Sequence, residues 1–431
     1  MDLPDPIIIP RNQHSISRKD IDREALKVLY RLRDAGFSAY LVGGGVRDLY
    51  LGKTPKDFDI STDARPGQLR NLFRNSRVIG KRFRLVQVFF RGNKIVEVST
   101  LRCRSEYDIE GAEEVLPANN TFGSVAEDAF RRDLTINSLF YEVENFTVID
   151  YVGGVEDLKN GIIRVVGDPD RRIRRDPVRI MRAIRHAARN DFTIEERTWQ
   201  AILTNLEYLA MCPDSRIRDE LFKDMRGGAC ARWATLAMEC GLFSTLLPFY
   251  GPDLIPAVKD RLDQLFKVID RLHGEGAKVD ESLLVAMLLL PWAEEVLHLH
   301  GAPTRGGEAY QFARTLRDRM DTAVNHLNIN RAQKELVTGF LVNLPVFNEA
   351  FGDGGWPKWL IKKSYFKDCL RFFQLVREAE GKGQVSVADY TLPEEDMETS
   401  VKVPRKRGKR PGRRAPVVVG KAKGGIFGLK R

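Results

Sequence analysis

Two short stretches decide the fold of this chain: LVGGGVRD at residues 41–48 and PKDFD at residues 55–59. The apolar residues that lead into the glycines are typical of a buried strand, and residues 46–51 are typical of the helix that follows. Glycines at such a turn let backbone N–H groups approach phosphate oxygens, and the N-terminus of the helix attracts negative charge. The first stretch therefore predicts a phosphate-binding turn formed by Gly43, Gly44 and Arg47.

The second stretch places two aspartates one residue apart, Asp57 and Asp59. Side chains alternate along a strand, so both carboxylates are expected on the same face. Mg²⁺ is commonly held by one or two carboxylates and completes its shell with waters and substrate phosphates. A glycine run alone is often only a loop, and an Asp-x-Asp pair alone is often a solvated strand end. Together and in this order they predict nucleotidyl transfer, and the glycine spacing fits neither the Walker pattern nor the dinucleotide-binding pattern.

A third acid, Glu97, lies in the second strand of a predicted hairpin formed by residues 83–90 and 95–101. It is either a carboxylate that supports Asp57 and Asp59 or part of the polar face of a half-exposed strand. The sequence leaves both interpretations open.

Residues 127–138 have helical character and contain Arg132, Asp133 and Asn137. Asp133 and Asn137 are four residues apart, so they are expected to share one face of a helix. Asp133 could equally cap that helix. Because a phosphate-binding turn and a carboxylate pair precede this segment, we interpret it as a nucleotide contact.

A basic helix is predicted to begin near Pro177, because proline suits the first turn of a helix. Asp176 and Arg179 are three residues apart and can offer acceptor and donor edges to a base. The alternative is an ordinary ion pair on the surface. The helix also carries a stripe of arginines with almost no acid beside them in the sequence, and this stripe predicts contacts with RNA phosphates. Its members are Arg179, Arg182, Arg185 and Arg189.

The net charge of +10 is concentrated at one end of the 431-residue chain. Residues 401–431 contain twelve Lys or Arg and no acid, so the rest of the chain is slightly acidic overall. This tail is interrupted by Pro and Gly, and we expect it to be disordered and to bind a polyanion. Its candidate RNA-binding residues are Arg405, Lys406, Arg407, Lys409, Arg410, Arg413 and Arg414.

The cysteine pattern and the apolar segments predict a cytoplasmic protein. The five cysteines are scattered and form no Cys-x-x-Cys pair, so we expect reduced thiols. The N-terminus lacks the apolar run of a secretory signal, and the longest apolar stretch, residues 283–292, is too short to span a bilayer. The six histidines show no metal-ligand spacing.

The residues gathered so far resemble the bacterial poly(A) polymerase and tRNA nucleotidyltransferase family from about residue 9 to about residue 250. Further stretches that carry the resemblance are GKRFRLVQV at residues 80–88, EDAFRRDLTINSLFY at residues 127–141 and DYVGGVEDL at residues 150–158. Together with the basic tail, they are most similar to the poly(A) polymerase side of the family. Two positions depart from the family pattern. Arg175 stands where an acid is common in the tRNA enzymes, and Gln87 stands where a histidine is expected.

The resemblance implies an α+β fold, in which a small mixed αβ head with a palm-like sheet is followed by an all-α neck, body and tail. Repeated amphipathic patterns over residues 216–390 independently predict helices. The implied boundaries are residues 1–20 for an N-terminal extension, 21–165 for the catalytic head, 166–230 for the neck, 231–390 for the body and tail, and 391–431 for a disordered basic C-terminus.

The resemblance also implies a role for each candidate site residue. The ligands of two catalytic Mg²⁺ ions would be Asp57 and Asp59, and Asp133 would be an additional active-site acid. The triphosphate of ATP would be held by Gly43, Gly44 and Arg47. The phosphates and sugar of the incoming nucleotide would contact Arg132 and Asn137, and its base edge would face Asp176 and Arg179.

The implied activity is that of a template-independent poly(A) polymerase, which transfers AMP from ATP to RNA 3′-hydroxyl ends and releases pyrophosphate during RNA 3′-end processing and decay. The alternative is a CCA-adding or A-adding tRNA nucleotidyltransferase, which uses the same head. A catalytically idle RNA-binding adaptor would predict a degraded carboxylate pair, whereas Asp57 and Asp59 are intact. The implied partners are RNA 3′ ends, ATP and proteins of RNA decay, and no membrane span is expected.

Truncation of the chain at about residue 400 is expected to weaken binding to RNA of any sequence. Each lost phosphate contact lowers the slope of log affinity against log salt by about 0.7 to 0.9. Fluorescence anisotropy with labelled oligoribonucleotides over a salt series measures both effects. An unchanged slope would show that the tail does not contact RNA.

Overall fold

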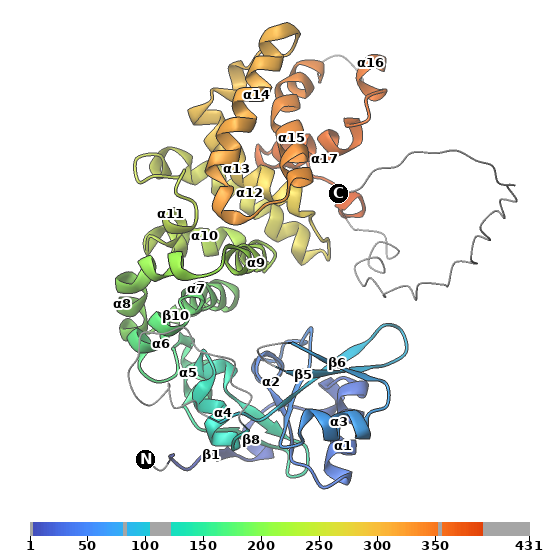
Figure 1. The fold of residues 1–431 in the computed structure, drawn as a ribbon, viewed down its shortest axis with the longest axis vertical. Helices are drawn as coiled ribbons and strands as arrows, with labels where there is room; N and C mark the ends of the chain where they lie inside the picture. The colour runs from blue at the N-terminus through green and yellow to red at the C-terminus, as the bar shows by residue number, and fades with distance from the viewer. Residues whose placement is uncertain (1–2, 81–83, 104–121, 352–355, 391–431) are drawn as a thin grey trace, which may run out of the picture. The chain divides into compact units, whose positions relative to one another are not determined.

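The computed structural model describes residues 3–80, 84–103, 122–351 and 356–390. Within these residues, a mixed sheet with helices occupies the N-terminal part and helices dominate the remainder, which confirms the predicted α+β fold (Figure 1). The predicted basic tail, residues 391–431 with Arg405–Arg414, lies outside the described residues. Phe83, the first residue of the predicted hairpin, also lies outside them.

The described residues of the head form one eight-stranded sheet with the strand order β1-β8-β7-β2-β3-β6-β5-β4. The strands are β1 (Ile7–Ile9), β2 (Ala39–Val42), β3 (Asp59–Thr62), β4 (Ser76–Ile79), β5 (Leu85–Phe89), β6 (Ile95–Thr100), β7 (Phe140–Glu142) and β8 (Thr147–Asp150). The predicted hairpin corresponds to β5 and β6, which pair antiparallel. A separate parallel pair joins β9 (Ile162–Ile163) to β10 (Thr193–Ile194).

The register of the central strands brings the separate sequence motifs to one edge. Val42, the residue before the glycine turn, pairs with Asp59 on β3 and with Phe140 on β7. On the other side of β3, Ile60 pairs with Val98 of β6 in a parallel ladder. The glycine turn, the aspartate stretch and the start of β7 therefore meet where β2 ends.

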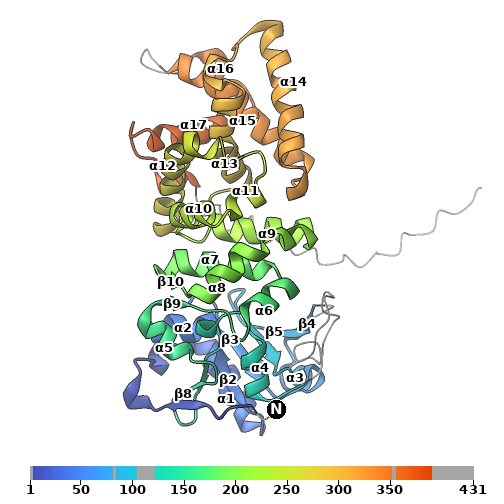
Figure 2. The same ribbon diagram turned by 90° about the vertical axis from the view of Figure 1, so that its left-hand side faces the viewer.

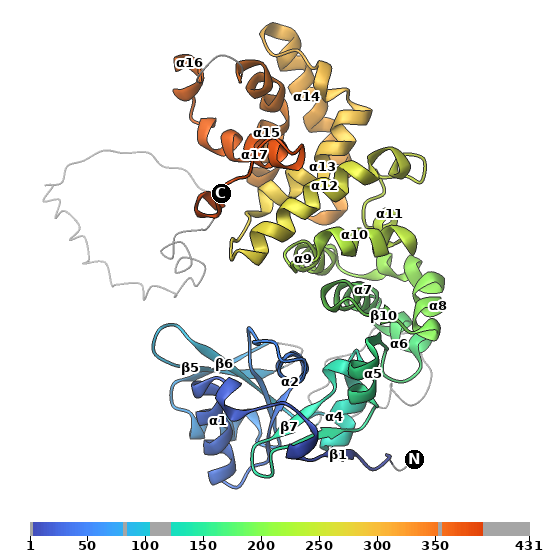
Figure 3. The same ribbon diagram turned by 180° about the vertical axis from the view of Figure 1, so that it is seen from behind.

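One face of this sheet is covered by α1 (Arg23–Asp34), which packs against β2, β3 and β6 (Figure 3). Ala25, Val28, Leu29 and Leu32 follow helical spacing and are all buried, so they form the apolar stripe of the helix. The helix begins after Asp22, whose carboxylate accepts hydrogen bonds from the N–H groups of Glu24 and Ala25. This packing holds the strands that carry the site.

The other helices of the head are short, and each is tied to a site segment or to a sheet edge. They are α2 (Gly44–Tyr50), α3 (Pro66–Leu72), α4 (Val125–Arg131) and α5 (Gly154–Asn160). A 3₁₀ turn, η4, covers Thr135–Asn137 and packs against α2 and α5.

The remaining described chain is helical. Its helices are α6 (Pro169–Arg175), α7 (Val178–Asn190), α8 (Glu196–Asn205), α9 (Asp214–Met225), α10 (Cys230–Glu239), α11 (Leu242–Leu246), α12 (Ile255–Gly274), α13 (Glu281–Val296), α14 (Gly306–Ala323), α15 (Arg331–Ala350), α16 (Lys358–Ile361) and α17 (Phe366–Ala379). Successive packing contacts join α7 to α10, α10 to α12, and α13 to α15 and α12 (Figure 2). Among the described residues, no helix is both long enough and apolar enough to cross a membrane.

Two local expectations from the sequence are wrong. The helix predicted over residues 127–138 ends at Arg131, and the chain turns at Arg132 before η4, so Asp133 and Asn137 do not share a helix face. The strand predicted to carry both aspartates begins only at Asp59, which leaves Asp57 in the turn before it. In each case a tertiary contact replaces the regular spacing, because the chain must bend at this edge to bring the motifs together.

Asp150 fixes the turn that supports η4. Its buried carboxylate accepts hydrogen bonds from four successive N–H groups, those of Val152, Gly153, Gly154 and Val155, at 2.9 to 3.1 Å. The turn then lets α5 approach η4 so closely that a Cβ atom on Gly154 would lie 2.2 Å from the carbonyl oxygen of Thr135. The DYVGGVEDL stretch is therefore a structural support for the segment that carries Asn137.

Replacement of Asp150 by Ala is expected to lower the free energy of unfolding by about 2–4 kcal/mol, because it leaves several buried N–H donors without acceptors. Urea unfolding measures this change. The matched control is Asp168→Ala, which removes the exposed N-cap of α6 and its hydrogen bond from the Arg171 N–H. This change is expected to lower the free energy of unfolding by about 1 kcal/mol. Equal losses in the two variants would contradict the special role of Asp150.

Candidate active site

Three carboxylates lie at the edge where β2 ends. The parallel register of β3 and β6 places Asp59 and Glu97 next to each other, on the face opposite the buried pair Ile60 and Val98. Asp57 precedes β3 by two residues and lies close enough for its charge to act on Asp59. The structure therefore favours the first of the two interpretations of Glu97, a carboxylate beside the aspartate pair.

The electrostatics of Asp59 reflect this crowding. Asp59 still touches solvent, but its carboxylate is partly enclosed by protein. This burial, together with the charges of Glu97 and Asp57, raises the pKa of Asp59 to about 6, and Arg132 opposes the rise. Within the described residues, neither aspartate has a hydrogen-bond or ion-pair partner of its own. Glu97 accepts one hydrogen bond, at 3.0 Å, from Nε2 of Gln87.

The glycine turn lies between two guanidinium groups. A Cβ atom on Gly43 would lie 3.4 Å from Nη1 of Arg132, and one on Gly44 would lie 3.5 Å from Nη2 of Arg47. Gly43 also has a φ of +69°, which an L side chain rarely adopts. The turn therefore needs glycine at position 43 for its conformation, and it brings backbone N–H groups and two arginines together.

Arg132 connects the turn to the carboxylates. It forms an ion pair with Asp128 at 2.8 Å and donates hydrogen bonds to Oγ of Ser61 at 3.3 Å and to the carbonyl of Asn137 at 3.4 Å. Its guanidinium also lies over the ring of Phe140. These contacts fix the predicted nucleotide-binding arginine close to Asp59. The sequence did not predict the roles of Ser61 and Asp128, because no spacing rule connects them to Arg132.

Arg47 is only 5% exposed, and its partners lie within the protein. Nη1 donates to Oδ1 of Asn137 at 2.6 Å and contacts Nδ1 of His186 at 3.3 Å, and Nη2 pairs with Asp48 at 2.8 Å. Burial, with the charge of Arg47 as the next cause, lowers the pKa of His186 well below its ordinary value, so the imidazole is neutral. Arg47 therefore holds the glycine turn in place by linking it to Asn137 and to α7.

Asp133 points to the neck and pairs with Nε of Arg182 on α7 at 2.5 Å. Burial alone would raise the pKa of Asp133, but Arg182 and Arg179 outweigh it and hold that pKa well below its ordinary value. Arg179 also donates from Nη1 to the carbonyl of Arg132 at 3.1 Å, and Arg172 donates to the same carbonyl at 2.6 Å. These contacts fasten the neck to the segment that carries Arg132 and Asp133.

The predicted base-reading pair has a second cationic neighbour. Asp176 lies 3.8 Å from Nε of Arg179 and 2.8 Å from Nη2 of Arg216 on α9. An additional donor beside the pair was not evident from the sequence, because Arg216 is distant from it in the chain.

The predicted RNA stripe on α7 needs correction at Arg185. This side chain is buried, and it pairs with Glu220 and Asp224 of α9. A phosphate would have to replace two buried carboxylates, so Arg185 is a structural residue and not an RNA contact. The expectation that the stripe lacks compensating acid is wrong for the same reason, since the acids come from α9 and from Asp133.

Arg189 differs from its neighbours, because it is exposed and has no hydrogen-bond acceptor within the described residues. It lines a cavity of about 510 Å³ together with Lys56, Lys223 and Arg226, and the acids Asp219 and Glu281 also belong to the lining, with Glu281 paired to Arg226 at 3.1 Å. Lys56, the residue before Asp57, contacts Nε2 of His273 on α12 at 3.2 Å. A cationic cavity therefore adjoins the aspartate stretch.

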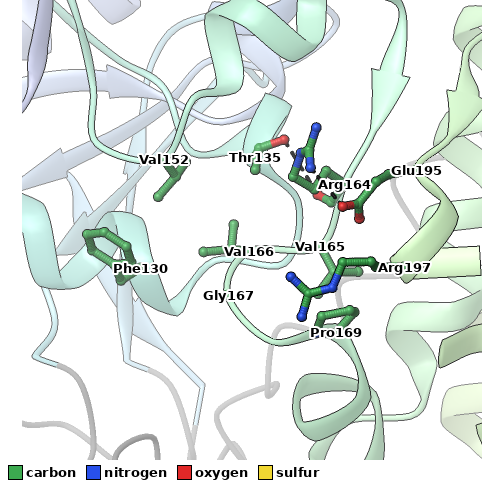
Figure 4. Close-up of a pocket in the computed structure, with 10 residues that line it drawn as sticks. All are labelled: Phe130, Thr135, Val152, Arg164, Val165, Val166, Gly167, Pro169, Glu195 and Arg197. Carbon is green, nitrogen blue, oxygen red and sulfur yellow. Dashed lines mark hydrogen bonds and ion pairs between the residues drawn. The ribbon is translucent and has the colours of Figure 1, made fainter.

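A second cavity, of about 150 Å³, lies between the head and α8 (Figure 4). Its polar lining is already paired, since Arg164 binds Asp157 at 3.0 Å and Glu195 at 2.7 Å. It contains none of the predicted site residues.

Comparison with known proteins decides the family. Residues 39–164 match the poly A polymerase head domain, and residues 191–254 match the segment described as the probable RNA and SrmB-binding site of polymerase A. Poly(A) polymerase I of Escherichia coli O6:H1 is 38% identical over 442 aligned residues, which cover 96% of this chain and 93% of the relative. The chain belongs to the poly(A) polymerase family.

The tRNA branch of this poly(A) polymerase family matches a smaller part of the chain. The CCA-adding enzyme of Lactobacillus helveticus is 42% identical over 205 residues, which cover 47% of this chain and 50% of the relative. The similarity in fold to a CCA-adding enzyme covers more of this chain than the sequence similarity just described. The crystal structure of the Bacillus stearothermophilus CCA-adding enzyme in complex with CTP has a TM-score of 0.62 and 23% identity, and it covers 85% of this chain and 80% of that chain.

The carboxylate cluster has the donor chemistry of a magnesium site. Within the described residues, no group of three or more His, Cys, Asp or Glu side chains is arranged as a complete metal site. Two aspartates without partners of their own among the described residues, one with a raised pKa beside Glu97, nevertheless form an oxygen-rich and negatively charged cluster. Mg²⁺ takes few protein ligands and fills its shell with substrate oxygens, so these residues fit it.

Replacement of Glu97 by Gln is expected to lower the pKa of Asp59 from about 6 towards its ordinary value, because a neighbouring negative charge is removed. In the native protein, Asp59 takes up its proton as the pH falls through about 6, whereas the unfolded chain does so near 3.8. The folded state is therefore favoured below the unfolded pKa, and this contribution is lost as the pH rises through 6. NMR titration of the carboxyl carbons in metal-free protein measures the pKa. An unchanged value in the variant would separate Glu97 from the site.

Proposed function

We propose that this protein is a template-independent poly(A) polymerase, which transfers AMP from ATP to RNA 3′-hydroxyl ends and releases pyrophosphate. The observation that carries the proposal is the alignment with poly(A) polymerase I, which continues through the neck and body over 96% of the chain. The match to the CCA-adding relative covers 47% of the chain. The geometry of the head supports the same reaction class.

In the proposed reaction, the hydrogen-bond donors and the carboxylates of the site have different roles. The N–H groups of the glycine turn, together with Arg132, bind the triphosphate, and Arg47 and Asn137 hold the turn in place. Asp57 and Asp59, supported by Glu97, would hold two Mg²⁺ ions, which when bound supply stabilisation of the attacking and leaving oxygens of an in-line displacement. The protein contributes positioning and charge neutralisation, so no nucleophilic side chain is required.

Asp176 is proposed to accept from the adenine amino group, and Arg179 to donate to an acceptor on the same base edge. Support comes from Arg179, which lies 3.8 Å from Asp176 and contacts the carbonyl of Arg132 at 3.1 Å. Arg216, at 2.8 Å from Asp176, orients the carboxylate. This assignment places the base between the neck and the phosphate-binding turn.

The RNA 3′ end is proposed to enter through the cationic cavity beside Asp57. Within the described residues, Lys56 and Arg189 have no acid partner there, and the description of residues 191–254 as a probable RNA-binding segment supports the same surface. That description also names SrmB, and we propose proteins of RNA decay as partners on this basis.

We propose a cytoplasmic location, because all five cysteines are free thiols.

A second candidate is a CCA-adding or A-adding tRNA nucleotidyltransferase. It is supported by the 42% identity over 205 residues to the CCA-adding enzyme of Lactobacillus helveticus. Arg175 in place of the acid common in tRNA enzymes argues against it.

The deciding experiment is incorporation of each labelled NTP, with Mg²⁺, onto an unstructured oligoribonucleotide, a tRNA that lacks CCA and a tRNA that ends in CC. Long products made only of A on the unstructured primer are expected. Addition confined to tRNA, and ending after CCA or a single A, would establish the second candidate.

Asp57→Ala and Asp59→Ala are expected to lower the rate by about 1,000-fold or more with the fold intact, because several kcal/mol of transition-state stabilisation are lost. The matched control is the exposed acid Asp34, replaced by Ala.

A further inference from the structure

A lysine-rich surface lies at the C-terminal end of the described helices. Residues 356–367 contain four lysines and no acid, namely Lys358, Lys362, Lys363 and Lys367, and all four are exposed. In the part of the chain that the structure describes, none of them has an acid partner. Two other body lysines differ, since Lys267 pairs with Asp263 at 2.6 Å and Lys334 pairs with Asp321 at 3.0 Å. An exposed acid, Asp368, follows Lys367 directly, so the excess of positive charge lies mainly at Lys358, Lys362 and Lys363.

The segment is firmly anchored. The ring of Trp356 lies 5.0 Å from that of Phe347 and 5.4 Å from that of Phe373, and Leu360 is completely buried. The short helix α16 packs against α17, beside the end of α15 (Figures 1 and 2). Trp356 and Leu360 are four residues apart and face inward, so the side chains between and after them are held on the outside.

The outward face is aromatic as well as basic. Trp359 is 47% exposed and Ile361 is 51% exposed, and both lie between Lys358 and Lys362 in the sequence. A large apolar side chain that remains in water on an anchored segment makes no contribution to the core, and such exposed groups often mark a binding surface. An exposed indole bordered by ammonium groups is the combination that binds single-stranded nucleic acid, because bases stack on the ring while phosphates contact the cations.

We propose that Trp359 and the four lysines form a platform for single-stranded RNA, separate from the active site, that holds the chain upstream of the reacting 3′ end. The name "α16 platform" is used for these five residues. The proposal rests on the proposed polymerase function, because it takes the same RNA as its ligand. The helices around the platform carry none of the predicted nucleotide-site residues, so the platform adds a second point of contact.

The observations favour RNA over an acidic protein surface. Lysine ammonium groups are rotatable point charges that follow a phosphate backbone without fixed geometry, whereas bidentate recognition of carboxylates is the property of arginine. The platform itself contains no arginine. Adenine has a large π-face, so a growing poly(A) chain supplies both ligands that the platform needs.

The first test compares affinity for oligo(A) of about 10 and about 40 nucleotides, since only the longer one can occupy both the active site and a second site. The variant K358Q/K362Q/K363Q is expected to lower the ratio of long to short affinity by about tenfold, and to reduce the salt slope for the long oligomer by about 2. The matched control is K19Q/K159Q/K259Q, which removes the same charge at exposed lysines elsewhere. An unchanged ratio, or an equal fall in the control, would overturn the proposal.

The second test addresses stacking. Trp359→Ala is expected to lower the same ratio, Trp359→Phe to restore most of it, and Trp359→Leu not to restore it, because Leu keeps apolar area without a π-face. Thermal unfolding checks that all variants remain folded. Polyglutamate is included as a competitor. Binding of polyglutamate that depends on Trp359, without such dependence for oligo(A), would assign the surface to an acidic protein and overturn the RNA platform.

The two proposals fail in different ways. A short primer cannot reach both the active site and the platform. AMP incorporation onto that primer by the unmodified protein therefore tests the polymerase function independently of the platform. If that incorporation occurs and the affinity ratio does not depend on the lysines, only the platform is refuted. If no nucleotide is incorporated onto any primer, the polymerase function is refuted whatever the binding ratios show.

Discussion

The site depends on the register of β2 between β3 and β7. Val42 pairs with both Asp59 and Phe140, so the glycine turn, the aspartates and the segment before β7 must meet where β2 ends. This register is set by burial on the opposite face of the sheet, where Leu41, Ile60 and Val98 contribute to the core. A slip of one residue would expose these side chains and turn Asp59 inward. Hydrophobic packing thus places the carboxylates, although none of the packed residues takes part in the chemistry.

The second constraint is the attachment of the neck. Arg172, Arg179 and Arg182 bind carbonyl and carboxylate groups of the segment that follows α4, and Arg185 joins α7 to α9 through two buried acids. Removing one partner of such a buried pair typically costs about 3–5 kcal/mol, because the other charge is left uncompensated. The sequence predicts that the arginines of α7 bind RNA, but in the structure Arg179 and Arg182 attach the neck to the head. The cations left free, Arg189 and Lys56, adjoin the active site.

The sequence was informative wherever chemistry depends on neighbours in the chain. The glycine turn, strand β2, the hairpin of β5 and β6, and the helical half were predicted correctly from local patterns. It was uninformative wherever a partner comes from a distant segment. The acids that neutralise Arg182 and Arg185, the arginine beside Asp176 and the imidazole beside Arg47 are brought together only by the fold. The helix predicted across Arg132 failed for a related reason, since contacts with Ser61 and Asn137 hold that residue outside the helix.

Charge pairing separates structural cations from those available to a polyanion. Arg185 and Lys362 are both basic residues in helical parts of the chain, but one is buried against two carboxylates and the other is exposed without an acid partner. A count of basic residues in a sequence window treats both alike, whereas the structure shows that Arg185 is buried and paired and that Lys362 is exposed. The residue types agree with this division, because planar guanidinium groups suit fixed interior pairs and hydrated ammonium groups suit a mobile backbone. The arginines of the neck therefore fix the geometry of the reaction, and the free lysines and Arg189 remain available to bind its polymeric substrate.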